Sequence, residues 1–486
     1  MTPPVFLIGA GDLPPSLPHP SLQTFIMGLL DFVLNLLGFS RKPDSVDQGA
    51  APASRTPSST ATNEPFRSVL ESPAPEAAGK SKAPGNQKKS GSSLPRKPQL
   101  KPLPKLRYQS NLIATPVSQE VCEGKPYRFA WSGSHPGEFL NLSQDCDQRW
   151  LDYFGLPVLK TPDDLAQWLG IPIGKLAWLT HRTLRGQRAE NVKQSHYSYR
   201  WLTKKSGGHR LIEAPKCELK RVQEQILREL LDHVPPHTAA HGFVTGRSIV
   251  TNAEPHVGQR LVLKFDLQNF YTNISYSRVV AIFRSLGYSR EVALWLGRLT
   301  TTSIPWNLNT PLKSWELTPY AARHLPQGAP TSPALANLSA FGLDVRLTGL
   351  AHAYELEYTR YADDLTFSGP GVVIPALSEI IPLVEKVIHA ERFLSRKSKR
   401  RVLRGSSRQS VAGVVVNEKL NVARSEYDRL KAILHNCRKH GPSTQKRDLE
   451  CDFSSHLLGR IAHVRQLNPR RAEKLQTIFS QINWSR

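Results

Sequence analysis

The run Glu357-Tyr-Thr-Arg-Tyr-Ala-Asp-Asp-Leu-Thr-Phe-Ser368 places two adjacent carboxylates, Asp363 and Asp364, inside an otherwise strand-like segment. The β-branched, aromatic and apolar residues on either side predict two short strands, with both aspartates at or near the reversal of the chain. Two neighbouring carboxylates repel each other, and this repulsion raises a pKa unless a cation neutralises the charge. The run therefore predicts a β-hairpin with a cation site, while a solvated turn is the alternative.

A third carboxylate ends the strand-like run Leu261-Val-Leu-Lys-Phe-Asp-Leu267. Alternation of period two places Asp266 on the less apolar face of this strand. If the strand lies beside the hairpin, Asp266 meets Asp363 and Asp364, and their oxygens are suitable ligands for a pair of Mg²⁺ ions. Two such ions, about 3.5–4 Å apart, activate an attacking hydroxyl and stabilise a leaving pyrophosphate. Because neighbouring strand residues point to opposite faces, we expect Asp363 to be central and Asp364 auxiliary; the alternative is an isolated Asp266 at a buried edge.

Three segments occur in the order typical of one enzyme family. They are Phe265-Asp-Leu-Gln-Asn-Phe-Tyr-Thr-Asn-Ile274, Leu325-Pro-Gln-Gly-Ala-Pro-Thr-Ser-Pro333 with Asn337 after it, and Tyr361-Ala-Asp-Asp364. In these segments the chain resembles reverse transcriptases, and the resemblance extends over about residues 150–486. It implies that Asp266, Asp363 and Asp364 are catalytic and bind metal, and that the backbone carbonyl of Leu267 is a further metal ligand.

Two more segments narrow the resemblance to the bacterial retron enzymes. His241-Gly-Phe-Val-Thr-Gly-Arg-Ser-Ile249 runs into Asn252-Ala-Glu-Pro-His256, which matches the retron Asn-Ala-x-x-His signature. Val411-Ala-Gly413 departs from the usual Val-Thr-Gly, because Ala412 lacks the hydroxyl. The resemblance makes five positions candidates for RNA binding, and the missing hydroxyl puts that contact in doubt at Ala412. These positions are Asn252, His256, Val411, Ala412 and Gly413.

The segment around Gln327 and Gly328 has the composition of a nucleotide pocket. Its small, turn-prone residues allow the backbone to approach a flat base closely, and the amide of Gln327 can bond to base or sugar. A plain surface loop is the alternative. Tyr271 resembles the family's aromatic residue beneath the incoming sugar, where bulk rejects a 2′-hydroxyl; ordinary core packing is its alternative.

Basic residues provide candidate phosphate contacts. Tyr199-Arg-Trp-Leu-Thr-Lys-Lys-Ser-Gly-Gly-His-Arg-Leu-Ile212 predicts a hairpin with a basic turn. Lys205 and Arg210 match residues that the family directs at the β- and γ-phosphates, and the planar fork of Arg suits this contact. Lys399, in the basic run 396–404, lies where the family often has a lysine thought to protonate pyrophosphate. Solvated surface charges are the alternative in both places.

Composition limits the partners and the cellular environment. The 486 residues carry a formal net charge of +24, which favours a polyanionic partner whose binding weakens with salt. The five cysteines are odd in number and lack paired spacing, so they indicate a reducing cytoplasm and neither disulfides nor a zinc site.

The chain divides into six segments by composition and pattern. Residues 1–40 are apolar and predict a docking helix rather than a membrane span; residues 41–110 are rich in Pro, Ser, Ala and Lys and predict disorder. Residues 111–150 lead into the fingers. We predict an α+β right-hand polymerase, with fingers at 150–260, a palm with an antiparallel sheet at 260–415 and a helical thumb at 416–486.

Helical patterns supplement this division. We expect helices at 163–169, 173–180, 218–234, 455–467 and 471–482, and a helix that a capping box at Ser425–Asp428 opens.

The resemblance implies an RNA-directed DNA polymerase that uses two Mg²⁺ ions and dNTPs. It implies further that the enzyme extends a 2′-hydroxyl of a branching guanosine in its cognate noncoding RNA, makes branched multicopy single-stranded DNA, and serves antiphage defence with an effector protein. No segment resembles a ribonuclease H domain, so a host ribonuclease H is expected to remove the template. The alternatives are another bacterial reverse transcriptase, of the group II intron or diversity-generating type, and a noncatalytic RNA-binding scaffold.

Overall fold

The computed structural model describes residues 121–124, 126, 129–133, 135–181, 188–204, 207–445 and 452–484. The docking helix predicted within 1–40, the disorder predicted for 41–110 and the side chain of Lys205 lie outside the described residues. Over the described ranges, no helix has the length and apolar character needed to cross a membrane.

The described helices and strands follow one another along the chain in this order: β1 (Val121–Glu123), β2 (Trp131–Ser132), β3 (Glu138–Leu140), α2 (Gln148–Phe154), α3 (Pro162–Trp168), α4 (Ile173–Leu179), β4 (Tyr197–Thr203), β5 (His209–Pro215), α5 (Cys217–Glu229), α6 (Ile249–Ala253), β6 (Leu261–Asp266), α7 (Tyr276–Ser285), α8 (Arg290–Thr300), α9 (Thr318–Ala321), α10 (Ser332–Ser339), α11 (Phe341–Ala353), β7 (Glu357–Tyr361), β8 (Asp364–Gly369), α12 (Leu377–Ala390), β9 (Arg401–Arg404), β10 (Ser410–Val411), β11 (Val414–Val415), α13 (Arg424–His440), α14 (Phe453–Leu467) and α15 (Pro469–Ser480).

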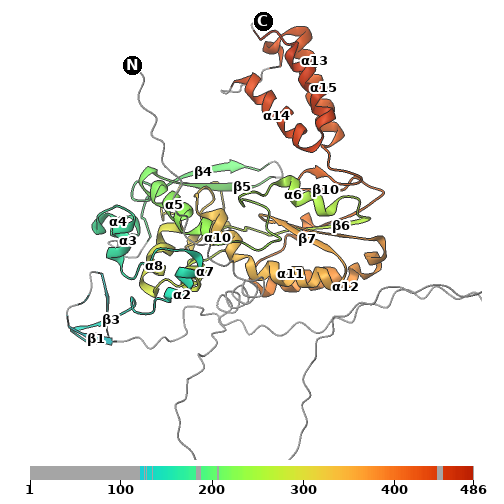
Figure 1. Cartoon of the computed structure of the whole chain (residues 1–486). Coiled ribbons are helices and arrows are strands. Elements are labelled where there is room, and N and C mark those ends of the chain that lie inside the picture. The colour runs from blue at the N-terminus through green and yellow to red at the C-terminus, as the bar shows by residue number, and fades with distance from the viewer. Residues whose placement is uncertain are drawn as a thin grey trace, which may run out of the picture. The chain divides into compact units, whose positions relative to one another are not determined.

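A four-stranded antiparallel sheet, in the order β7-β8-β6-β9, carries the site (Figure 1). On one face Leu263, Phe265 and Phe367 join the main core, and α11 and α12 run along this side. On the other face Val262 is fully buried with Ala253 in a second apolar cluster. Both faces of the sheet are therefore covered. The face of β6 that was predicted to be less apolar is buried at Val262.

The predicted β-hairpin ahead of the sheet is confirmed. β4 and β5 pair over seven residues each, from Tyr197 opposite Pro215 to Thr203 opposite His209. The helix predicted for 218–234 is shorter, because α5 ends at Glu229 and Leu230 has φ −120° and ψ −60°, outside the helical region. A 3₁₀ turn, Leu231–His233, follows it.

The other predicted helices are present, with one error at a start. α3 and α4 match 163–169 and 173–180 closely, and α14 and α15 match the last two patterns. Asn468 ends α14 and caps α15, where its side chain accepts a hydrogen bond from the N–H of Arg471. The capping box predicted at Ser425–Asp428 was wrong: α13 begins at Arg424 with Ala423 as N-cap, and no side chain caps it.

Three of the cysteines, Cys146, Cys217 and Cys437, are free thiols.

Candidate active site

The sheet brings the three predicted aspartates together. Asp266, the last residue of β6, pairs directly with Asp364, the first residue of β8. Tyr361 pairs with Asp364 across β7 and β8, so Ala362 and Asp363 form the two-residue turn between the strands. The N–H of Leu267 donates to the carbonyl of Asp363 at 2.9 Å, which holds the turn against the end of β6.

The turn has a strained backbone that neighbouring residues support. Ala362 has φ +54°, a region that residues with a side chain rarely adopt. Gly242 lies against it so closely that a Cβ atom on this glycine would be 2.7 Å from the backbone nitrogen of Ala362. Any larger residue at 242 would displace the turn at Ala362, which gives the first glycine of the 241–249 segment a physical role.

A fully buried ion pair lies directly behind the turn. Arg360 donates to both carboxylate oxygens of Asp344, and its side chain also donates to the carbonyl of Ala362 and to Oδ1 of Asn337. Asn337 in turn donates to the carbonyl of Gly242 at 2.9 Å. Arg360 was not predicted as a site residue; its place within an apolar strand beside the aspartates was the available signal.

The carboxylates differ in their surroundings. Oδ2 of Asp266 lies 2.7 Å from Nζ of Lys399, and Oδ1 lies 3.7 Å from Nε of Arg396. Burial raises the pKa of Asp363, and the negative charges of Asp364 and Asp266 raise it further. Burial also raises the pKa of Asp364, against the lowering effect of Lys264. Two cations therefore contact Asp266, whereas at Asp363 and Asp364 burial outweighs the lowering effect of the nearby lysines on the pKa.

These oxygens match the ligand preference of Mg²⁺, although they do not form a finished metal site. Among the residues that the structure describes, no three His, Cys, Asp or Glu side chains form a group that could hold an ion. The two cations on Asp266 occupy its oxygens, while burial, together with repulsion from neighbouring carboxylates, keeps the pKa of Asp363 and Asp364 high. Hard oxygen donors with excess negative charge are what a divalent ion requires, so the residues present fit the predicted metal.

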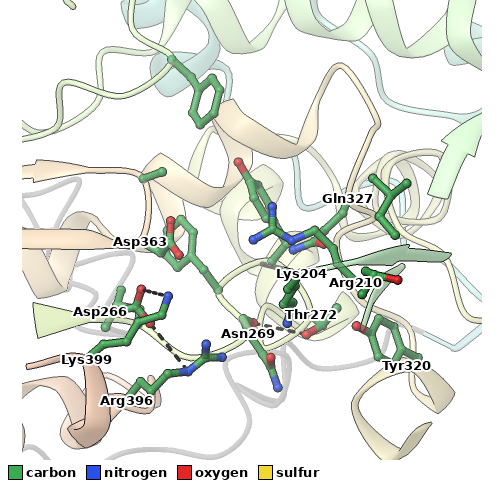
Figure 2. A pocket seen from close by; sticks show the side chains of 17 residues that line it. Lys204, Arg210, Asp266, Asn269, Thr272, Tyr320, Gln327, Asp363, Arg396 and Lys399 are labelled. Atoms are coloured by element: carbon green, nitrogen blue, oxygen red, sulfur yellow. Dashed lines mark hydrogen bonds and ion pairs between the residues drawn. The ribbon is translucent and has the colours of Figure 1, made fainter. Parts of the chain in front are cut away.

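A pocket of about 550 Å³ opens beside the aspartates. Figure 2 shows Asp266, Asp363, Lys399 and Arg396 on one side and Arg210, Gln327 and Tyr320 on the other. Of the predicted residues, those that line the pocket are Asp266, Leu267, Asp363, Arg210, Tyr271, Gln327 and Lys399. Asp364 and Gly328 are not among its lining residues.

Lys204 and Arg396 line the pocket but were not predicted. Burial lowers the pKa of Lys204, and the nearby charges of Arg396, Arg210 and Lys399 lower it further. These cations from the hairpin and from the 396–404 run therefore face one space, where an anion would relieve their repulsion. The sequence did contain the signal, because both residues lie beside predicted ones in basic runs.

The floor of the pocket joins the hairpin to the Gln327 segment. The N–H of Glu213 in β5 donates to the carbonyl of Gln327 at 2.8 Å. The next residue, Gly328, has φ +130°, and the backbone of Glu213 lies close to the position that a Cβ atom on this glycine would take. Glu213 also accepts from buried His324 at 3.0 Å. Burial by itself lowers the pKa of His324, but Glu213 outweighs this effect and the pKa lies above its ordinary value.

Tyr271 lies beside Asp363. Burial and the negative charge of Asp363 raise the pKa of Tyr271 to about 12.

Comparisons with known proteins agree with this geometry. Residues 202–416 match the family model described as reverse transcriptase (RNA-dependent DNA polymerase). The chain is 42% identical to Retron Mx65 reverse transcriptase of Myxococcus xanthus, over 68% of this chain and 73% of that protein. Retron Mx162 reverse transcriptase of the same organism is 33% identical (70% and 73%), and Retron Ec86 reverse transcriptase of Escherichia coli is 30% identical (71% and 94%).

The chain belongs to the retron reverse transcriptases. It is an RNA-directed DNA polymerase.

The signature residues of this retron reverse transcriptase are buried beneath the sheet. His256 is fully buried, and its two ring nitrogens lie 2.6 Å from the hydroxyl of Ser368 and 2.7 Å from that of Thr359. Burial lowers its pKa to about 3. The side chain of Asn252 is buried as well, and the backbone carbonyl of Asn252 accepts a hydrogen bond from the hydroxyl of Thr359. Asn252, in α6, and His256, in the 3₁₀ turn that follows α6, therefore connect this segment to β7 and β8 and offer no exposed surface to a ligand.

The second retron segment of the enzyme forms a tight turn. Val411 is buried, and Ala412 and Gly413 both have positive φ, at +46° and +87°, between β10 and β11. Two residues of positive φ are typical of a type I′ hairpin turn. Gly413 is exposed and Ala412 is half-buried, so of the five RNA-binding candidates these two remain accessible.

Proposed function

We propose that this retron reverse transcriptase copies a structured noncoding RNA into single-stranded DNA by a metal-assisted attack of a hydroxyl on an incoming deoxynucleotide. The observation that carries the proposal is the direct pairing of Asp266 with Asp364, with Asp363 beside them at the edge of a basic pocket. Carboxylates and cations that line one pocket match the divalent ions and the triphosphate of such a reaction.

In this proposal Asp266, Asp363 and the carbonyl of Leu267 hold two Mg²⁺ ions, and Asp364 contributes from its neighbouring position. When bound, the ions stabilise charge on the attacking and leaving oxygens. Lys399 then exchanges its contact with Asp266 for the pyrophosphate, to which its ammonium group can donate a proton. The distance of 2.7 Å between Lys399 and Asp266 supports this role, because it places the ammonium at the reacting centre.

The rest of the pocket recognises the nucleotide. Arg210, with Lys204 and Lys205 of the same hairpin, holds the β- and γ-phosphates. Gln327 and Gly328 contact the base and sugar, and the ring of Tyr271 beneath the sugar excludes a 2′-hydroxyl. The half-buried position of Tyr271 next to Asp363 supports a gate at the site of chemistry.

The architecture in this proposal is a right hand. Residues 150–260 form fingers, 260–415 a palm around the four-stranded sheet, and 416–486 a thumb, with 111–150 as an extension. Support comes from the pocket itself, which has β4–β5 residues on one side and sheet residues on the other. The helices α13 to α15 carry many exposed basic residues, a composition suited to a nucleic-acid duplex.

Membership of the retron family supports a more detailed proposal about the priming site, the DNA product and the cellular role. We infer that synthesis begins at the 2′-hydroxyl of a branching guanosine in the cognate RNA and yields branched multicopy DNA in the cytoplasm. A host ribonuclease H would then remove template RNA, and an effector protein would connect the product to antiphage defence.

A primer-extension assay with Asp363→Asn tests the chemistry. The substitution keeps the shape of the side chain and removes its charge, so DNA synthesis on an RNA template should fall by at least about a hundredfold. Asp152→Asn, an exposed carboxylate in α2, is the matched control and should leave the rate unchanged. Equal synthesis by the parent and Asp363→Asn would reject the metal mechanism and favour a noncatalytic scaffold.

The branched start is tested with the RNA itself. The noncoding RNA transcribed beside the gene is supplied with guanosine or 2′-deoxyguanosine at the candidate branch position. If DNA joined to RNA forms with the guanosine RNA but not with the 2′-deoxyguanosine RNA, this result supports priming from the 2′-hydroxyl. Undiminished product from the deoxy version would reject it and leave a reverse transcriptase of another priming type.

A further inference from the structure

Two tryptophans in the connection between α8 and α10 are largely exposed. Trp306 exposes 69% and Trp315 71% of its surface. Both belong to residues 305–319, here called the 305–319 loop, between α8 and α10; Trp315 lies in its 3₁₀ turn, Ser314–Leu317, which leads into α9. Exposed aromatic rings of this size are a feature of binding surfaces, because burying them against a partner contributes a large apolar area.

The base of this loop is fixed to the protein. The N–H of Thr302 donates to the carbonyl of His324 at 2.9 Å, and the N–H of Ile304 donates to that of Tyr320 at 3.2 Å, so the two ends of the loop are paired. On its other side the N–H of Trp306 donates to the carbonyl of Ala189 at 3.2 Å. Trp306 is therefore exposed on an ordered support.

A cation accompanies the first ring. The guanidinium carbon of Arg188 lies 3.8 Å from the centre of the Trp306 ring, and its Nε donates to the carbonyl of Ile304. An arginine stacked on a tryptophan offers a flat surface with positive charge, which suits a base and its phosphate together. The nearby carboxylates Glu190 and Glu316 already accept hydrogen bonds from Gln194 and from the N–H of Lys313.

The loop is connected to the nucleotide pocket through aromatic contacts. The indole N–H of Trp201, in β4, donates to the carbonyl of Asn309 in the loop at 3.2 Å. The Trp201 ring meets the ring of Tyr320 edge-on, with 6.0 Å between the centres, and Tyr320 lines the pocket. The exposed tryptophans are thus attached to the hairpin that also provides Arg210 to the pocket.

We propose that Trp306 and Trp315, with Arg188, form a stacking surface for unpaired bases of the RNA template on their way to the pocket. The inference rests on the proposed assignment of that pocket to the incoming nucleotide. Template nucleotides ahead of the pocket are single-stranded, and every base offers a flat π-face to an aromatic ring without regard to sequence. The +24 net charge of the chain and the stacked arginine favour this polyanion over an apolar protein partner.

The test compares two primer–template duplexes that differ in the single-stranded template ahead of the primer. One has a long 5′ RNA extension, and the other has a single templating nucleotide. Equilibrium binding is measured by fluorescence anisotropy for the parent, Trp306→Ala and Trp315→Ala. Each alanine variant should bind the long-extension duplex at least about fivefold more weakly and the short one as tightly as the parent does.

Two further variants exclude a general defect. Trp306→Phe keeps a stacking face and should recover most of the affinity, while Tyr153→Ala, which removes a 45% exposed ring from α2, should change neither affinity. Equal loss on both duplexes, or no loss on either, would overturn the proposal; the second result would leave the surface to a protein partner. Extension of the short duplex by every variant would show that polymerase chemistry is intact, whatever the stacking surface does.

Discussion

Nζ of Lys399 lies 2.7 Å from Oδ2 of Asp266, so a lysine holds the carboxylate to which the metal would bind. Lys399→Ala removes a competitor for this oxygen and should lower the Mg²⁺ concentration that gives half-maximal synthesis. The maximal rate should fall by about a hundredfold if the ammonium group protonates pyrophosphate. Both quantities come from primer extension in a Mg²⁺ titration.

Lys397→Ala is the matched control, since it removes an equal charge from an exposed position in the same run. Similar Mg²⁺ curves for Lys397→Ala and Lys399→Ala would assign the effect to general electrostatics and remove the specific role of Lys399.

The raised pKa values of Asp363 and Asp364 predict an unusual pH dependence of stability. A carboxyl whose pKa is higher in the folded than in the unfolded state takes up protons more readily when folded, so stability decreases as pH rises through that interval. Without metal, Asp363→Asn should therefore unfold at a higher temperature than the parent at neutral pH. Thermal unfolding with and without Mg²⁺ measures this, and Mg²⁺ should stabilise the parent more than the variant.

The difference should shrink at acidic pH, where the parent carboxyl is protonated. A variant less stable than the parent at neutral pH without metal would contradict the raised pKa of Asp363.

Local patterns in the sequence predicted the strands, and they predicted the meeting of the aspartates only on the condition that the two strands are adjacent. Alternation in 261–267 and the reversal at Asp363 each depend on neighbouring residues, and the pairing of Asp266 with Asp364 follows once the strands are adjacent. The helix starts were less predictable, because several polar residues near Arg424 could cap and the structure uses none of them. Tertiary packing decided that end.

Long-range side-chain contacts could not be read from the sequence. Motif matching placed His256 in a retron signature, but its burial against Ser368 and Thr359 depends on residues more than a hundred positions away. The ion pair between Arg360 and Asp344 could not be predicted from the sequence either, since an arginine inside a strand does not indicate which carboxylate pairs with it. The strands that carry the aspartates thus follow from local rules, while the adjacency of these strands and the residues that support the aspartates follow only from the fold.

Breaking the buried ion pair between Arg360 and Asp344 should cause a large loss of stability. Asp344→Ala leaves an uncompensated buried guanidinium and should reduce the free energy of unfolding by about 3–5 kcal/mol, measured by urea denaturation. Glu224→Ala, which breaks the exposed pair with Lys220, should change it by less than about 1 kcal/mol. Similar losses for the two variants would show that Arg360 finds another partner.

A double variant separates stability from positioning. Asp344→Leu with Arg360→Met replaces both charges by apolar groups of similar size and should recover much of the stability. It cannot restore the hydrogen bonds from Arg360 to Ala362 and Asn337, so DNA synthesis should remain low in a folded protein. Synthesis at the parent rate would mean that the catalytic turn needs no support from Arg360.

Because His256 is buried, we predict that this residue of the retron signature stabilises the sheet and makes no direct contact with RNA. His256→Ala removes two hydrogen bonds and leaves the hydroxyls of Ser368 and Thr359 without this partner, so the free energy of unfolding should fall by about 1–3 kcal/mol. Because the pKa of His256 is lowered to about 3, its contribution is complete above the ordinary value of 6.5 and is lost as pH falls below it. The parent and the variant should therefore converge in stability as the pH is lowered. Affinity for the cognate RNA, measured at neutral pH on folded protein, should change little; a loss of RNA affinity with unchanged stability would instead assign His256 to the RNA contact that the family signature suggested.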